Sequence, residues 1–176
     1  DNSLMTVGDE GAVACRLELV GVWTGDPPGF TGSGLLGAVR SPADGVMDEV
    51  HALRDATGAD LVAIISESGI GICGVAYLAP ESQGSGFSVT AQSCAIGNLT
   101  FAHELGHNQG ATHDVDNAGG SYRPYGFGWR WTTTGGSLRR SVMAYSPGSR
   151  RPNFSNPEVL NGGVPTGVVD IVGRAL

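Results

Sequence analysis

Alternating and continuous apolar segments predict strands in the first half of the chain. Residues 15–23 alternate and are rich in side chains that favour strands. Residues 59–66 form a continuous apolar run, which is typical of a central buried strand. Two further short strands are predicted at 73–79 and 87–94, and the polar loop 80–86 joins them.

Apolar residues at helical spacing predict two helices. In residues 42–58 the apolar positions recur at helical intervals, and Gly58 follows as a C-terminal cap. Residues 97–110 predict a second helix that ends at Gly110. Residues 25–34 are rich in glycine and proline and are predicted to be a loop.

The second half of the chain has little helical pattern. Residues 125–131 and 137–144 flank a turn rich in threonine and glycine, and they predict a hairpin. Residues 165–176 predict a short terminal helix. No internal repeat or low-complexity linker divides the chain, so we expect a single domain over residues 1–176.

Size and charge narrow the class of protein. A length of 176 residues with 40% hydrophobic residues suits one compact domain with a core. No apolar run reaches the roughly 18 residues that a membrane-spanning helix needs. The net charge of −7 argues against nucleic acid and anionic membranes as partners. We expect the protein to be a monomer. The first residues lack the layout of a signal peptide, so we expect the targeting segment of an exported protein to lie upstream.

The segment HELGHNQGATHD, residues 103–114, has the spacing of a metal site. His103 and His107 are four residues apart, so a helix places both imidazoles on one face, one turn apart. Gly110 lets the chain leave the helix and turn back, so that His113 reaches the same ion. A lone pair of histidines at this spacing is often only a surface pair, but a third histidine at this offset is hard to obtain by chance.

Three neutral imidazoles predict one catalytic Zn²⁺ ion. They leave a fourth coordination position open for water, and an open position distinguishes a catalytic zinc from a structural one. Zinc lowers the pKa of such a water to about 7. Glu104 lies next to a ligand without being one, and we expect it to act as the general base and to pass the proton to the leaving amine. His51 has no partner at ligand spacing and is interpreted as structural.

The residues after the motif support the metal site. The pentapeptide SVMAY fits a methionine turn, with Met143 forming an apolar floor under the imidazoles. Tyr145 either ligates zinc reversibly or binds the oxyanion of the intermediate, or it is a packed tyrosine with a satisfied hydroxyl. Asp114 is interpreted as a carboxylate that supports the ligands. Asp116 and Asn117 could belong to a calcium site, but the rest of an oxygen cage is missing, so calcium is left open.

Three cysteines, Cys15, Cys73 and Cys94, permit one disulfide and one free thiol in an exported protein. Cys73 begins one predicted strand and Cys94 ends the next, and those two ends lie side by side in an antiparallel pair. We therefore expect a Cys73–Cys94 disulfide with Cys15 free. The alternative is that the cysteines are buried small apolar residues.

With the histidine motif and SVMAYSPG, the chain resembles the metzincin clan of zinc endopeptidases. It is most similar to the bacterial peptidyl-Asp metallopeptidases, and the adamalysin/reprolysin group comes next. The resemblance covers roughly residues 15–170 and includes the stretches GVMDEVHALRDATGADLVAIIS, CGVAYL and NFSNPEV. Members of the clan have another strand and helix before the segment that matches residues 15–23, so the resemblance implies that this chain begins inside the domain.

The resemblance implies an α/β (α+β) metalloprotease domain with two lobes. The upper lobe, about residues 1–110, would have a twisted mixed sheet and long helices. The irregular lower lobe, about residues 111–176, would contain the methionine turn. A protein or peptide substrate would lie extended in a cleft and add as a strand to an exposed edge. The residues that we assign to this edge are Gly74, Val75 and Ala76.

The resemblance also implies where specificity arises. In the clan, the segment after the methionine turn walls the pocket for the residue that follows the scissile bond, and here it contains Arg150 and Arg151. A guanidinium in such a pocket would bind a carboxylate, so we expect a preference for an acidic residue, Asp above all. The alternative is that both arginines are solvated surface charges, and Arg139 and Arg140 are weaker candidates for the same role.

Together these features predict a secreted zinc endopeptidase. The alternatives are an adamalysin-like endopeptidase with apolar specificity, a hydrolase of small amides, and a non-enzymatic binding module on the same fold. Inactive versions of such a fold usually lose the glutamate or a ligand, whereas Glu104 and the three motif histidines are all present.

Overall fold

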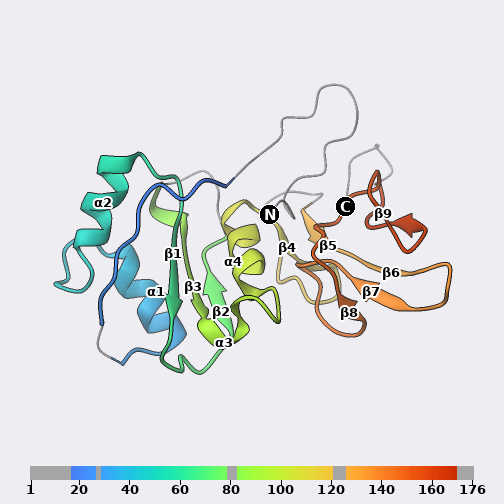
Figure 1. Cartoon of the computed structure of the whole chain (residues 1–176), viewed down its shortest axis with the longest axis horizontal. Coiled ribbons are helices and arrows are strands. Elements are labelled where there is room, and N and C mark those ends of the chain that lie inside the picture. The colour runs from blue at the N-terminus through green and yellow to red at the C-terminus, as the bar shows by residue number, and fades with distance from the viewer. Residues whose placement is uncertain (1–16, 27–28, 79–82, 121–125, 170–176) are drawn as a thin grey trace. The chain divides into compact units, whose positions relative to one another are not determined.

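The structure is a computed structural model that describes residues 17–26, 29–78, 83–120 and 126–169 (Figure 1). The chain divides into two compact units, Glu18–Gln109 and a second unit whose described part is essentially Gly110 onward. Among the described residues, no helix has the length and apolar character needed to cross a membrane.

The unit Glu18–Gln109 is built on a three-stranded sheet of order β1-β3-β2. β1 (Val62–Ser66) pairs with the central strand β3 (Phe87–Ala91) in parallel, and β2 (Gly74–Ala76) pairs with β3 antiparallel. The sheet is therefore mixed, and with its helices it confirms the expected mixed α/β fold.

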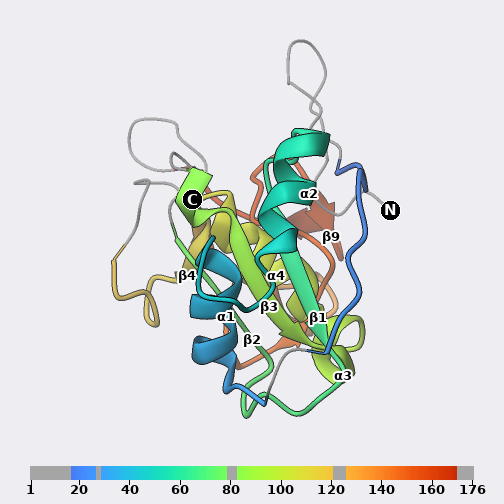
Figure 2. The same cartoon turned by 90° about the vertical axis from the view of Figure 1, so that its left-hand side faces the viewer.

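Helices cover both faces of this sheet. α1 (Gly32–Arg40) and α2 (Glu49–Thr57) lie on one face, and α4 (Thr100–Asn108) lies on the other, as the two views show (Figures 1 and 2). The short helix α3 (Gln92–Ala95) and a 3-10 turn (Gln83–Ser85) complete the unit. The core is formed by apolar residues of α1, the loop before α2, α2 and β3, including Leu36, Val39, Met47, Val50, Phe87 and Val89.

Five segments of this unit differ from the sequence-based expectation. The run 59–66 forms β1, but at the edge of the described sheet, and β3 takes the central position. The described part of the predicted strand 15–23 pairs with none of the described strands and forms no strand, and Leu19 and Val22 are 81% and 70% exposed. The predicted helix 42–58 begins only at Glu49, since Met47 has a left-handed φ of 60°. Its end is as predicted, because Gly58 caps it with a φ of 67°.

Helix α1 was not predicted, because its glycines lower helix propensity and the sequence before it is loop-like. Burial decides the outcome: Leu35, Leu36 and Val39 fill the core from one face of the helix. The predicted strand 87–94 ends at Ala91, and the chain turns directly into α3.

The second unit consists of short strand pairs. β4 (Thr112–Asp114) pairs in parallel with β5 (Phe127–Gly128). β6 (Arg130–Thr132), β7 (Leu138–Arg140) and β8 (Ser149–Arg150) form a sheet of that order. The predicted hairpin is thus present as the antiparallel pair β6–β7, but shorter.

A tight hairpin ends the described part of the chain. β9 (Leu160–Asn161) and β10 (Val164–Pro165) are joined by Gly162 and Gly163, both with positive φ, which suits a two-residue hairpin turn. The predicted terminal helix is wrong for residues 165–169, which form no helix, and its part from residue 170 on lies outside the described residues.

Candidate metal centre and active site

Helix α4 presents two imidazoles from one face. His103 and His107 are one turn apart, and their ring centroids are 4.7 Å apart with an interplanar angle of 85°. His103 is 4% exposed, so its ring is largely shielded from water. The four-residue spacing thus places both rings where one ion could contact them.

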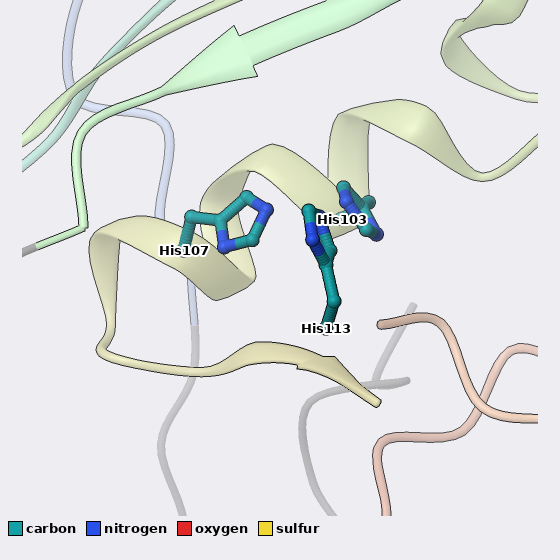
Figure 3. A group of neighbouring side chains, drawn as sticks. All are labelled: His103, His107 and His113. Atoms are coloured by element: carbon teal, nitrogen blue, oxygen red, sulfur yellow. The ribbon is translucent and has the colours of Figure 1, made fainter. Parts of the chain in front are cut away.

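The third imidazole comes from the strand that follows the helix. Gly110 turns the chain with a φ of 92°, and His113 follows in β4. The three histidines each offer one nitrogen, and these nitrogens lie within 4.8 Å of one another (Figure 3). Figure 3 shows two rings projecting from the helix and the third extending toward them from the strand.

This donor set fits zinc. Tetrahedral coordination with Zn–N distances of about 2.1 Å places ligand nitrogens roughly 3.4 Å apart. The nitrogens here lie within 4.8 Å of one another, so they would have to approach by at most about 1.4 Å to coordinate one ion. Three neutral nitrogen donors also leave a coordination position for water or substrate.

Glu104 is buried beside the ligands and is not part of the histidine group. It is 4% exposed on α4, and it follows His103 directly. Its side chain approaches strand β2, because a Cβ added to Gly74 would lie 2.5 Å from the Glu104 Oε1 atom. The carboxylate is therefore enclosed between the helix and the first residue of that strand.

Asp114, next to His113, is engaged in a network of hydrogen bonds. Its carboxylate accepts from the Tyr145 backbone N–H at 2.8 Å, the Asn117 amide at 2.7 Å and the Arg130 guanidinium at 2.6 Å. Burial raises the pKa of Asp114, but these three donors outweigh burial and hold the pKa below its ordinary value. The residue is thus a charged support for its neighbours.

Arg130 joins this carboxylate to the residues after the methionine turn. Besides Asp114 it contacts the Asp116 carboxylate at 3.1 Å, and it donates to the Tyr145 and Ser146 carbonyl oxygens at 2.9 and 3.3 Å. Nothing in its local sequence marks Arg130 for this role, because its partners are 14 to 16 residues away along the chain. Asp116, one of the two residues considered for a calcium site, is thus paired with Arg130.

The predicted methionine turn is tightly packed. Met143 is 1% exposed, and Val142 and Ala144 are fully buried. A Cβ on Gly128 would lie 2.6 Å from the Ala144 backbone nitrogen, so β5 lies directly against the turn. Tyr145 places its ring 4.1 Å from the His113 ring and is 42% exposed. The Tyr145 ring therefore lies against the ring of a predicted zinc ligand.

The four arginines considered for substrate binding differ in their surroundings. Arg150 aligns with Arg140 across the β7–β8 pair, and Arg151 follows directly after the end of β8. Burial, together with the positive charge of Arg150, lowers the pKa of His113 against the opposing effects of Asn117 and Asp114.

The two weaker candidates already have acceptors. Arg140 donates to the Ala144 and Gly148 carbonyl oxygens at 2.6 and 2.8 Å. Arg139 donates to the side-chain oxygen of Asn161. Among the effects on the pKa of His113, the positive charge of Arg150 is the smallest, and it acts in the same direction as burial.

Strand β2 is placed as an edge. It pairs only with β3 among the described residues, and it consists of the three residues assigned to substrate binding, Gly74, Val75 and Ala76. Cys73, just before it, forms a disulfide with Cys94 in α3, with a Cα–Cα distance of 5.4 Å. Cys15 lies outside the described residues.

Asn108 is a residue that the sequence interpretation missed. It is 2% exposed at the end of α4, and its amide nitrogen lies 2.9 to 3.0 Å from three carbonyl oxygens, those of Tyr77, Ser85 and Phe87. The signal available in the sequence was a polar residue directly after His107, inside the motif. His51, interpreted as structural, contacts the Val39 carbonyl oxygen at 3.0 Å.

Comparison with known proteins gives consistent matches. A protein named peptidyl-Asp metalloendopeptidase from Stenotrophomonas maltophilia (strain R551-3) is 38% identical over 133 residues, which are 73% of this chain and 32% of that protein. Proteins of the same name from Xanthomonas campestris and Pseudomonas aeruginosa are 37% and 30% identical, over 73% and 89% of this chain and about 30% of each relative. The chain thus spans about a third of the length of the curated relatives it matches.

A solved structure, described as a chaperone-substrate complex, shares the fold with a TM-score of 0.56 and 24% identity. It matches 81% of this chain, which corresponds to 22% of that chain. Residues 24–155 match the metallopeptidase family M12, whose members use zinc. With its three histidines in place and this match over most of its length, the chain belongs to metallopeptidase family M12.

Proposed function

We propose that this chain is the catalytic part of a zinc-dependent endopeptidase. The observation that carries the proposal is the convergence of three imidazole nitrogens within 4.8 Å, beside a buried glutamate outside the ligand group. A zinc ion held there would supply Lewis-acid chemistry to a carbonyl and a water. A binding module without activity would need neither the open ligand set nor the buried acid.

Glu104 is assigned as the general base. It is next to His103 on α4 and 4% exposed, so its carboxylate is held close to the ligands and away from bulk water. It takes a proton from the attacking water and transfers it to the amine that leaves when the peptide bond breaks.

Replacement of the base tests this assignment. Glu104→Gln should keep stoichiometric zinc, and its kcat should fall by about 10²–10⁴-fold, because only the proton acceptor is removed. His107→Ala should instead lose zinc. Glu158→Gln, the same change at an exposed position, is the matched control and should leave both quantities unchanged. Near-native turnover of Glu104→Gln would remove the basis for the mechanism.

Substrate is proposed to bind as an added strand on β2. This strand offers an edge next to Glu104, since Gly74 is its first residue and approaches the carboxylate. Main-chain hydrogen bonds to such an edge select extended peptides over small amides. Methylation of single backbone nitrogens in a good peptide substrate should raise KM at the positions that pair with β2 and leave the other positions unaffected.

A preference for Asp after the scissile bond is proposed to depend on Arg150. The names of the relatives point to Asp recognition, and the charge of Arg150 acts on His113. Arg151 provides a matched comparison, because it is the neighbouring arginine and lies just outside strand β8.

Matched peptides with Asp, Asn or Leu at that position test the preference. We expect Asp to be cleaved fastest, Arg150→Ala to reduce the ratio of Asp to Asn cleavage by about tenfold or more, and Arg151→Ala to change it little. Equal cleavage of Leu and Asp peptides by the unmodified protein would favour the alternative of apolar specificity.

Secretion is proposed on the basis of the disulfide. Structural disulfides persist in oxidising compartments and are rare in the cytosol. Mass mapping of the protein recovered from culture medium should find Cys73 linked to Cys94 and Cys15 as a free thiol. Recovery of the mature protein only from the cytosol, with reduced cysteines, would count against secretion.

A further inference from the structure

Gly74 approaches the proposed general base more closely than any side chain would allow. A Cβ built on Gly74 would lie 2.5 Å from Glu104 Oε1, 2.8 Å from Glu104 Cγ and 2.8 Å from Thr100 Cγ2. Carbon atoms in contact normally keep about 3.5–4.0 Å. All three atoms belong to helix α4, so the space that a side chain would need at Gly74 is filled by the helix that carries the metal ligands.

The backbone of Gly74 does not itself require glycine. Its φ is outside the positive range that disfavours side chains, unlike that of Gly71, whose φ is 78°. Gly74 also pairs with Thr90 in a regular antiparallel register. Glycine weakens a strand because it loses entropy and packs nothing, so its presence here indicates a close approach by another element.

The contact limits the positions open to the Glu104 side chain. Glu104 is 4% exposed, and its Cγ and its Oε1 both lie against Gly74. An added methyl group would have to move the carboxylate or separate β2 from α4. Either movement changes the position of the base relative to the proposed substrate edge.

We propose that Gly74 is a positioning residue for the general base: the missing side chain forms the space in which the Glu104 carboxylate is held against strand β2. This inference rests on the proposed function in so far as Glu104 is the base. The packing between Gly74 and Glu104 can be measured separately from catalysis.

The packing is tested by a double-mutant cycle on melting temperature, with zinc and with chelator. Gly74→Ala should lower the melting temperature by several degrees, and most of that loss should disappear when Glu104→Ala removes two of the three crowded atoms. Gly69→Ala is the matched control, because a Cβ there meets nothing within 4 Å and its φ is not positive. An equal loss in both backgrounds would overturn the proposal.

Expression failure would also be informative. If Gly74→Ala does not fold, the double variant Gly74→Ala/Glu104→Ala should recover a folded protein. Failure of the double variant to fold, when Glu104→Ala alone folds, would overturn the proposal.

Kinetics then tests the positioning role. Gly74→Ala should retain zinc and lower kcat by roughly tenfold to a hundredfold with little change in KM, since a misplacement of about 1 Å is enough for that loss. A raised KM with normal kcat would contradict the positioning role and assign Gly74 to substrate binding alone. If Glu104→Gln keeps activity while the stability coupling is present, the proposed mechanism fails and the packing stands.

Discussion

Asn108→Asp is the most direct test of how helix α4, which carries His103 and His107, is anchored to the sheet. The substitution keeps the shape of the side chain and replaces its two N–H donors by a carboxylate oxygen. That oxygen would face the carbonyl oxygens of Tyr77, Ser85 and Phe87, which now lie 2.9 to 3.0 Å from the amide nitrogen. Asn108 is 2% exposed, so water cannot compensate.

The expected cost follows from these contacts. Two lost hydrogen bonds cost about 0.5–1.5 kcal/mol each, and leaving a buried acceptor unsatisfied costs about 1–3 kcal/mol more. The sum, about 2–6 kcal/mol, is a large part of the roughly 5–15 kcal/mol that stabilises an ordinary domain. Burial among carbonyl oxygens would raise the pKa of the new carboxyl, so the loss of stability should grow as the pH rises.

The assay is urea unfolding with and without zinc, at acidic and neutral pH. Gln109→Glu is the matched control, because it makes the same amide-to-acid change one residue later, at an exposed position. The reasoning is refuted if Asn108→Asp costs no more than Gln109→Glu. A folded Asn108→Asp protein should also show a raised KM, because Tyr77 follows the proposed substrate strand directly.

Three further predictions address the site and the disulfide. The pKa of Asp114 is lowered, so its carboxylate stabilises the fold at pH values above 3.8, its ordinary pKa, and this contribution disappears as the pH falls through the lowered pKa. Asp114→Asn should therefore cost about 2 kcal/mol in urea unfolding at pH 7. The difference from the unmodified protein should vanish in strong acid. Cys73→Ser/Cys94→Ser should lower the free energy of unfolding by about 3 kcal/mol, given the separation of 21 residues, and an unchanged value would exclude a stabilising disulfide. Chelation should abolish peptide cleavage and lower the melting temperature, and added Zn²⁺ should restore both; activity that survives with zinc below stoichiometry would contradict the metal assignment.

Local patterns in the sequence were sufficient for the elements that local interactions determine. The spacing of His103 and His107 requires a helix to bring both rings together, and the structure has that helix at Thr100–Asn108. The apolar run at residues 59–66 likewise contains β1, but its expected central position is wrong, because β1 lies at the edge of the described sheet with Ile65 51% exposed. In both cases the signal and the structure span the same few residues.

Elements that depend on distant partners were predicted less well. Helix α1 is stabilised by burial of Leu35, Leu36 and Val39 in the core, which outweighs its glycine-rich composition. Residues 17–23 have the composition of a strand, yet they pair with none of the described strands, and composition without backbone pairing does not make a strand.

The sequence by itself determined the kind of site: three imidazoles at ligand spacing, a neighbouring carboxylate and a downstream methionine. The tertiary structure alone decided what surrounds it, namely Gly74 against Glu104, Asn108 on three carbonyl oxygens, and Arg130 on Asp114. The physical reason is that ligand spacing is a property of one helix and its following turn. Packing space and hydrogen-bond partners instead come from strands and loops that are distant in the chain and adjacent only after folding.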